Sequence, residues 1–245
     1  MGETPGPAPE RQPIADIFLR RLNLENPQDL ALARALDEQS FEAINPFAYE
    51  HPDPHAVAHT GMSEDELKRW MADRPTGMLR VIEVPAGEIG EKRAVGFVYL
   101  YNDSSNDTDF RARAQILREK QGLPSNRSVW EMNFWVVDGT GDAVVEEAVR
   151  QTLTEFAQSR GRETTTVMFV EAQDLREAYQ EAVGKAVTLG DLKKPATKAV
   201  AENTFQDTRV LEQSGFIHSG RIAYEPGASP KDFAYTVNVR PGQAF

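Results

Sequence analysis

The chain has 245 residues, 40% of them hydrophobic and 27% charged, which is an ordinary composition for a globular protein. Its 38 acidic and 27 basic residues give a net charge of −11, which disfavours nucleic-acid binding and suits a cationic partner such as an amine. The absence of cysteine excludes disulfides, thiolate catalysis and cysteine-ligated zinc, and it suits a reducing cytoplasm. Because no apolar run approaches about 18 residues, we expect a cytoplasmic protein with no membrane partner.

The N-terminal part of the chain predicts a tail followed by strands and helices. Residues 1–14 carry four prolines and no apolar core, which is typical of a disordered tail. Hydrophobic periodicity and turn residues then predict the following elements. They are a strand over 17–22, a helix over 28–41, a proline-broken loop over 44–61, a helix that starts at the Ser63 capping box, and strands over 78–84 and 93–102.

The second part of the chain alternates strands and helices around two long insertions. The first insertion covers 103–128 and contains a helix from Phe110 to Lys120; a strand over 129–137, a helix over 141–161 and a strand over 164–172 follow it. The second insertion covers 173–202, with a helix broken at Gly184, Gly190 and Pro195. The chain then predicts a helix over 208–214, strands over 216–225 and 232–240, and a tail over 241–245. This order predicts one α/β (α+β) domain over 15–240, with a mixed central sheet of six to seven strands flanked by helices.

The stretch VVDGTGDAVVEEAV, residues 136–149, places a glycine turn between a predicted strand and a predicted helix. The amides and the positive dipole end of a helix N-terminus attract anions, and glycines let the backbone approach closely. Asp138 and Asp142 oppose this, because carboxylates repel phosphate. A dinucleotide fingerprint would need glycine at Val144, and a P-loop would need Gly-Lys-Ser/Thr. The residues alone leave open an anion cradle and a plain strand-to-helix turn.

Four segments occur in a recognisable order along the chain. They are Glu131 in a predicted strand, Phe134-Trp135-Val136, Gly139-Thr140-Gly141, and Val210-Leu211-Glu212-Gln213-Ser214-Gly215-Phe216. Together they resemble the GNAT N-acetyltransferase superfamily, and within it the ribosomal-protein alanine N-acetyltransferase-like branch, over roughly residues 15–240. The resemblance implies transfer of an acetyl group from acetyl-CoA to a primary amine, on a peptide N-terminus or a small molecule, by direct attack in a ternary complex.

The resemblance also implies where acetyl-CoA binds. The pantetheine arm would pair with the backbone at Val136 and Val137, and an asparagine, here Asn203, would contact the arm. The pyrophosphate would lie on the turn formed by Gly139, Thr140, Gly141, Asp142 and Ala143. Three features depart from the family pattern. Asp138 stands where the family has Gln or Arg, a long insertion precedes Asn203, and Gln206 or Asp207 replaces a serine.

The chemistry needs a base for the amine and an acid for the departing thiolate. The resemblance makes Glu131 the candidate base, with a purely structural role as the alternative. Leu211 stands where relatives often carry an acidic tyrosine, which leaves Tyr224 as the candidate acid, with Thr208 and Ser214 as weaker substitutes. In relatives the acceptor site is shaped by the segment that here carries Phe47, Tyr49 and His55 and by the final hairpin.

Two charged patterns allow more than one interpretation. His55 and His59 lie four residues apart, a spacing that chelates metal on a helix. Pro52 and Pro54 precede them, so we favour a solvated loop near the acceptor entrance and expect no metal. The basic residues of the helix at 110–120 could reach a CoA phosphate or an acidic partner, although a solvated face is the commoner arrangement. These residues are Arg111, Arg113, Arg118 and Lys120.

A second function fits the same fold. The acidic turn and the insertions at 103–128 and 173–202 could serve a non-catalytic GNAT-fold protein that binds a protein partner and has lost tight CoA binding. The insertions are also candidate interface elements for a homodimer.

Overall fold

The structure is a computed structural model that describes residues 16–23, 25–36, 65, 78–87, 90–102, 108–192, 194–221 and 231–245. Several expectations lie outside these ranges. They concern the tail over 1–14, the helix from Ser63, the His55 and His59 pair, the acceptor residues Phe47 and Tyr49, and the candidate acid Tyr224.

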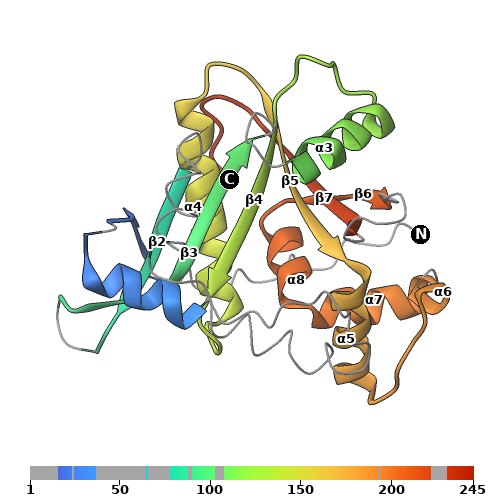
Figure 1. Cartoon of the computed structure of the whole chain (residues 1–245), viewed down its shortest axis with the longest axis horizontal. Coiled ribbons are helices and arrows are strands. Elements are labelled where there is room, and N and C mark those ends of the chain that lie inside the picture. The colour runs from blue at the N-terminus through green and yellow to red at the C-terminus, as the bar shows by residue number, and fades with distance from the viewer. Residues whose placement is uncertain are drawn as a thin grey trace, which may run out of the picture.

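A seven-stranded sheet in the order β1-β2-β3-β4-β5-β7-β6 runs through the domain (Figure 1). Its strands are β1 (Phe18–Arg21), β2 (Met78–Pro85), β3 (Lys92–Asn102), β4 (Val129–Val136), β5 (Thr164–Glu171), β6 (Ile217–Arg221) and β7 (Lys231–Val239). Among the strands of the described residues, β4 and β5 form the one parallel pair, and the other neighbouring pairs are antiparallel. This mixed sheet in a single α/β domain confirms the predicted fold class.

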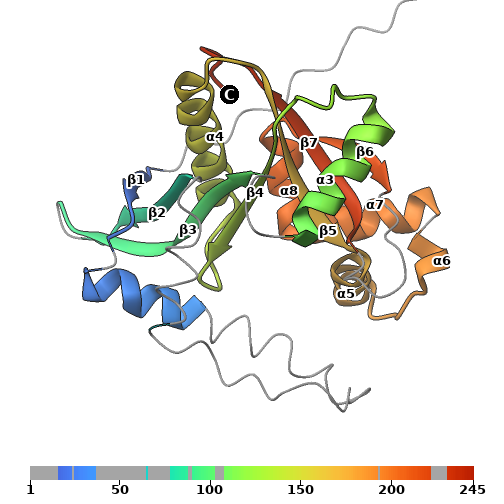
Figure 2. The ribbon, with the colours of Figure 1, turned by 45° about the horizontal axis from the view of Figure 1, so that its top comes forward.

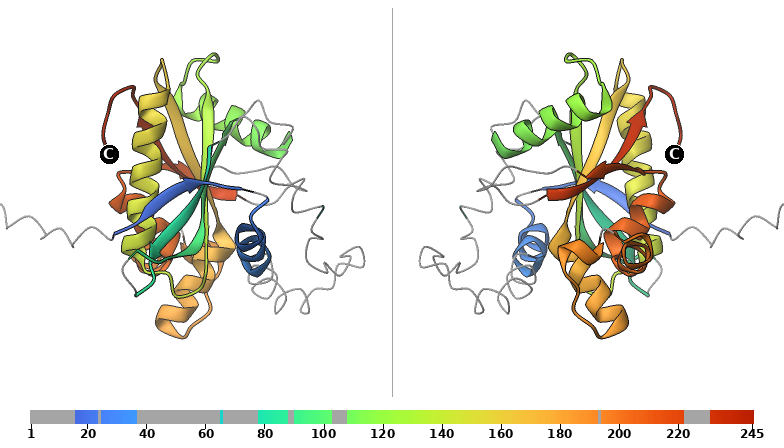
Figure 3. Two further views of the ribbon diagram at one scale, coloured as in Figure 1. Left: turned by 90° about the vertical axis from the view of Figure 1, so that its left-hand side faces the viewer. Right: turned by 90° about the vertical axis from the view of Figure 1, so that its right-hand side faces the viewer.

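Helices cover both faces of the sheet (Figures 2 and 3). The labelled helices are α3 (Thr108–Gln121), α4 (Asp142–Ser159), α5 (Ala172–Val183), α6 (Leu189–Leu192), α7 (Pro195–Thr204) and α8 (Gln206–Gln213). Helices α4 and α8 lie on one face, whereas α3 and the N-terminal helical residues 27–36 lie on the other. None of the described helices is both long and apolar enough to cross a membrane.

Strand β4 supplies side chains to all three hydrophobic clusters because successive residues of a strand point to opposite faces. Trp130 and Met132 pack in the core beneath α4. Val129 packs beneath α3, while Trp135 and Val137 pack against the cluster formed with the N-terminal helix. Glu131 lies between Trp130 and Met132 in sequence and therefore points to the face that α3 covers.

Helix α3 belongs to the core, although it comes from a segment expected as an insertion. Phe110, Ala114 and Leu117 are buried against the sheet. The Phe110 ring makes edge-to-face contacts with Tyr101 on β3 and Phe169 on β5, with centroids 5.0 and 6.3 Å apart. The helix is thus anchored across several strands, so removing it would expose the core.

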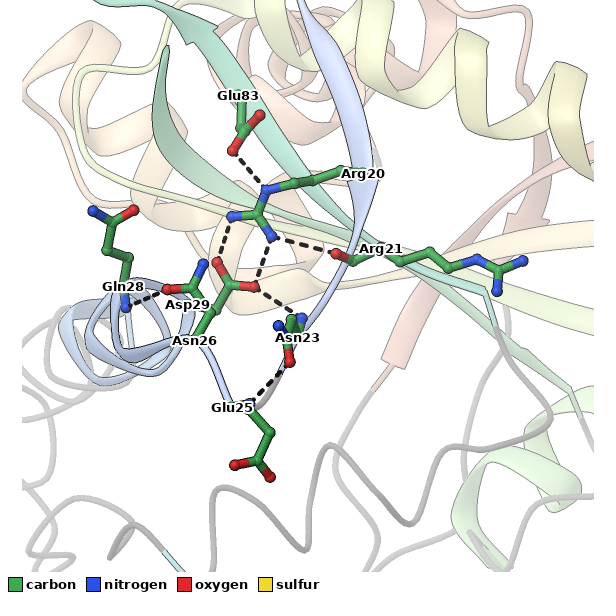
Figure 4. Close-up of polar contacts among 8 residues, drawn as sticks. All are labelled: Arg20, Arg21, Asn23, Glu25, Asn26, Gln28, Asp29 and Glu83. Atoms are coloured by element: carbon green, nitrogen blue, oxygen red, sulfur yellow. Dashed lines mark hydrogen bonds and ion pairs between the residues drawn. The ribbon is translucent and has the colours of Figure 1, made fainter. Parts of the chain in front are cut away.

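A network of ion pairs holds the N-terminal helix on the edge of the sheet (Figure 4). Arg20 on β1 donates from Nη1 to the buried carboxylate of Asp29 at 2.7 Å and from Nε to Glu83 on β2 at 2.6 Å. The side chain of Asn26 accepts from the Gln28 amide at 3.0 Å, which caps the helix start. One guanidinium therefore joins the helix to two strands.

The segment expected to be broken by Pro195 contains a further helix instead. Pro195 is the first residue of α7, where a missing N–H removes no intrahelical hydrogen bond. The predicted break at Gly184 is present, because α5 ends there with a left-handed φ of 69° and the Gly184 amide donates to the Gln180 carbonyl. Pro195 therefore starts a helix and does not break one.

The last residues, expected as a tail over 241–245, lie against α4. The Phe245 amide donates to the Thr154 hydroxyl at 3.3 Å, and the Phe245 side chain packs against the core cluster.

Candidate functional site

The sheet opens between the parallel strands β4 and β5 (Figures 1 and 2). The strands pair only through Val129–Thr165, Trp130–Thr166 and Glu131–Val167, although β4 continues to Val136 and β5 to Glu171. Beyond Glu131 the two strands diverge, and α8 lies across one face of the opening. The divergence separates the facing edges of β4 and β5, and an extended ligand could lie between them.

A glycine turn follows β4 and leads directly into α4. Gly139 adopts a φ of +80°, a conformation that residues with a side chain rarely take. The amide and hydroxyl of Thr140 both donate to the Val137 carbonyl, at 3.0 and 2.6 Å, which fixes the turn. Helix α4 then starts at Asp142 with Gly141 as its N-cap, and no side chain caps its first amides. Those amides point outward at the positive end of an 18-residue helix.

The start of α8 reaches back to this turn. The Gln206 side chain donates to the Thr140 carbonyl at 3.0 Å. Arg209 donates from Nε to Asp142 at 2.9 Å and from Nη1 to the carbonyls of Asn203 and Thr204 at 3.1 and 2.8 Å. The C-terminus of α7, the first turn of α8 and the N-terminus of α4 are therefore held together by two side chains.

A cleft of about 860 Å³ lies between the glycine turn, α5 and the α7–α8 junction. Its lining residues are Gly139, Thr140, Asp142, Asp174, Glu177, Ala178, Gln180, Glu181, Thr204, Phe205, Gln206 and Arg209. The cleft has the size of a small-molecule site.

The charges in the cleft are unbalanced. Four carboxylates line it, those of Asp142, Asp174, Glu177 and Glu181, against the single guanidinium of Arg209. Three of the carboxylates come from α5 and form the wall that faces the turn. A cation is favoured along that wall, whereas an anion is favoured only close to Arg209 and the α4 amides.

Glu131 lies at the point where β4 and β5 separate, under α3. Its side chain is buried, accepts a hydrogen bond from the Tyr101 hydroxyl and lies 3.6 Å from Nη2 of Arg113. The Arg113 guanidinium also stacks over the Phe169 ring of β5, 5.0 Å from its centroid. The carboxylate is thus enclosed by a phenol and a guanidinium, which is an arrangement that fits a structural anion as well as a base.

The prediction that the basic residues of α3 form a solvated face is wrong for Arg113. Arg111 and Lys120 are exposed, but Arg113 is only 5% exposed, and Arg118 is half-buried with its Nε donating to the Arg127 carbonyl. The reason is positional. Arg113 follows Phe110 by three residues and therefore lies on the helix face that packs against the sheet.

The other residues expected to bind acetyl-CoA are Val136, Val137 and Asn203, which lie at the end of β4 and at the end of α7. Val136 ends β4, and the Val137 amide already donates to the Val95 carbonyl of β3 at 2.9 Å. Asn203 is exposed at the end of α7, and its carbonyl, through Arg209, is connected to Asp142. Asn203 does not line the cleft, so a contact between its side chain and acetyl-CoA stays a prediction.

The two weaker candidate acids, Thr208 and Ser214, are buried at the two ends of α8. The Thr208 hydroxyl donates to the Phe205 carbonyl at 2.9 Å and to the Glu202 carbonyl, which stabilises the α7–α8 junction. Ser214 is buried at the end of α8. Neither residue lines the cleft.

Sequence reasoning missed the contributions of α5 and α8 to the cleft. Gln206 and Arg209 lie three residues apart and so share one helix face, which is a readable signal. Asp174, Glu177 and Glu181 likewise follow helical spacing. The pattern does not show which segment each helix face contacts. For α8, that segment is the glycine turn and the start of α4, which lie more than sixty residues earlier in the chain.

No protein-family model matches this chain, and no curated protein matches it. Solved structures do show similarity. A domain from Methanocaldococcus jannaschii DSM 2661 has 14% identity and a TM-score of 0.47, covering 91% of this chain and 99% of that chain. A GNAT-family acetyltransferase from Bacillus anthracis has 10% identity and a TM-score of 0.45, covering 91% and 94%.

Spermidine N-acetyltransferase from Vibrio cholerae, solved with CoA and spermine, has 12% identity and a TM-score of 0.45, covering 91% of this chain and 95% of that chain. At these identities and TM-scores, the similarity assigns neither a family nor a substrate to the chain.

Proposed function

We propose that the chain is a GNAT-type N-acetyltransferase that moves an acetyl group from acetyl-CoA to a primary amine. The acceptor would be a peptide N-terminus or a small-molecule amine. The observation that carries the proposal is the opening between β4 and β5, which leads directly to the glycine turn and the uncapped start of α4. An extended thioester arm and an anionic end group need these two features side by side.

The fit of acetyl-CoA can be judged from the polar groups around the opening. The amide-bearing arm would lie between the diverging ends of β4 and β5, and the amides at Gly141, Asp142 and Ala143 would receive the pyrophosphate. Arg209 adds one positive charge at the same place. The acidic wall on α5 opposes an anion, so the pyrophosphate is expected to stay on the α4 side of the cleft.

In the proposed reaction, the amine nitrogen attacks the thioester carbonyl, the C–N bond forms and the C–S bond breaks. Direct transfer is expected because the chain has no cysteine to carry the acetyl group. Glu131 is the proposed base and Tyr224 the proposed acid, with Phe47, Tyr49 and His55 lining the acceptor site. The enclosed position of Glu131 makes a test of its role necessary.

Isothermal titration with acetyl-CoA tests the proposal. Binding heat that saturates below millimolar ligand supports it, and an absence of heat at millimolar ligand contradicts it. If acetyl-CoA binds, Glu131→Gln should lower turnover of an amine panel without lowering acetyl-CoA affinity. A thermal unfolding curve of the same variant shows whether the loss of turnover follows simply from a loss of folding.

A second function is favoured by the acidic wall. Asp174, Glu177 and Glu181 form one charged surface of the cleft, which suits a basic segment of a partner protein. We infer that a non-catalytic GNAT-fold protein would use this surface for binding or assembly. The same titration separates the two functions, because a binding module without acetyl-CoA affinity gives no heat with this ligand.

A further inference from the structure

Arg209 and Asp142 connect two helix ends of opposite polarity. The Arg209 guanidinium donates from Nε to Asp142 at the start of α4 and from Nη1 to the carbonyls of Asn203 and Thr204 at the end of α7. Nη2 of Arg209 also lies 2.8 Å from the Asp142 carboxylate. The cation therefore bridges the negative end of α7 and an anion placed at the positive end of α4.

Asp142 lies at the N-terminus of α4, beside the amides that would receive an anionic ligand of this cleft. It is the first residue of α4, its carboxylate lies in the cleft, and Arg209 is its partner. A phosphate group placed on the first amides of α4 would lie within reach of the same guanidinium. Phosphate and the Asp142 carboxylate would then compete for one cation.

We propose that the Asp142–Arg209 pair is a built-in competitor that sets the affinity of the cleft for the phosphates of its ligand. This inference rests on the proposed binding of acetyl-CoA and adds a residue to it. Arg209, from α8, supplies the guanidinium among the residues that line the cleft, whereas Asp138 is exposed outside it. In the ligand-free protein the Asp142 carboxylate is paired with Arg209, and the ligand phosphate displaces this carboxylate.

The pair is weak enough to be displaced. The Arg209 and Asp142 side chains are 36% and 32% exposed, and ion pairs at such exposure contribute little because water and salt screen them. A doubly charged pyrophosphate makes stronger, charge-assisted hydrogen bonds to a guanidinium than one carboxylate does. Arg209 also keeps its two carbonyl partners on α7, so it does not have to move when the carboxylate leaves.

The test compares four variants, Asp142→Asn, Arg209→Gln, Arg209→Lys and Glu181→Gln, by isothermal titration with acetyl-CoA and, separately, with inorganic pyrophosphate. Asp142→Asn removes the competitor and should tighten both ligands by about two- to fivefold, the range expected for loss of one weak ion pair. Arg209→Gln removes the receptor and should weaken both by about tenfold or more. Glu181→Gln is the matched control, because it removes the same charge from the opposite wall of the cleft and should change affinity less than Asp142→Asn.

The outcomes separate this inference from the proposed function. If the wild-type protein binds acetyl-CoA and neither Asp142→Asn nor Arg209→Gln changes its affinity, the inference is overturned and the function stands. Equal increases in affinity in Asp142→Asn and Glu181→Gln also overturn the inference, because the overall negative charge of the cleft, and not the ion pair, would then limit the affinity. If neither the wild type nor Asp142→Asn binds acetyl-CoA, both fail. Thermal unfolding curves verify that each variant is folded, and Arg209→Lys should bind more tightly than Arg209→Gln.

Discussion

The Arg113 guanidinium lies 3.6 Å from the Glu131 carboxylate, and both side chains are buried beneath α3. The pair joins a helix to the strand residue where β4 leaves β5. A buried ion pair contributes little on balance, yet breaking it from one side is costly because the remaining charge stays buried. Removing one partner of this pair is therefore expected to destabilise the contact between α3 and β4.

Arg113→Met should lower the free energy of unfolding by about 3–5 kcal/mol, because Glu131 would be left buried without its cation. Urea denaturation measures the loss, and Arg111→Met on the exposed side of the same helix is the control. The double variant Arg113→Met/Glu131→Gln should regain most of the stability. A double variant as unstable as Arg113→Met would show that packing, and not the charge, is responsible.

Gly96→Ala should destabilise the sheet where β3 faces the end of β4. A Cβ at Gly96 would lie 2.3 Å from the Trp135 carbonyl oxygen and 2.8 Å from the Val136 Cα, so the strands would have to separate. We expect a loss of about 1–3 kcal/mol in urea denaturation, as for other overpacked sites. Gly161→Ala, whose Cβ meets no atom within 4 Å, is the control, and an equal loss there would contradict the steric explanation.

Asp29 should make the stability of the protein depend on pH in the acid range. Burial alone would raise the pKa of Asp29, but hydrogen bonds from Arg20 and the Asn23 amide, with the charge of Arg20, hold it below its ordinary value. A lowered folded pKa means that the stabilisation is complete above the unfolded pKa of about 3.9 and is lost as pH falls through the folded value.

Urea denaturation of the wild type and Asp29→Asn at several pH values measures this effect. The difference between the two proteins should be constant near neutral pH and shrink below about pH 3.9. A difference that stays the same throughout the acid range would rule out ionised Asp29 as its source.

His218 should titrate below its ordinary pKa. Burial and the Lys198 ammonium, 3.3 Å from Nε2, lower the pKa of His218, while the Glu202 carboxylate opposes them. The contribution of His218 to stability is therefore complete above the unfolded pKa of about 6.5 and declines as pH falls below it. NMR titration of the His218 ring, assigned with His218→Gln, gives the value.

Two further variants test the cause. Lys198→Met should move the His218 pKa upward, and Glu202→Gln should move it downward. Shifts of both variants in one direction would contradict the electrostatic explanation.

Much of the fold follows from local patterns in the chain. The strands at 78–84, 93–102 and 129–137 and the helix at 141–161 all form close to their predicted bounds. Their alternation and apolar periodicity are strong because one face of each is buried. Errors arose where one residue type serves two purposes, as with Pro195, which can start a helix as well as break one.

The candidate site was predicted only in part. The glycine turn over 139–141 was recognised because its backbone needs are visible in the residues themselves. The ion pair of Arg113 with Glu131 was not, because it joins a helix to a strand across the hydrophobic core. The same holds for Arg209 and Asp142, which come from different helices.

The sequence by itself determined the order of strands and helices, the absence of cysteine chemistry and the glycine turn at the start of α4, since these depend on near neighbours along the chain. Only the tertiary structure decided that β4 and β5 separate after Glu131, that Arg113 encloses this carboxylate, and that α5 gives the cleft an acidic wall. The physical reason is that strand pairing and charge compensation depend on which distant segments meet, and packing of the whole chain selects those partners.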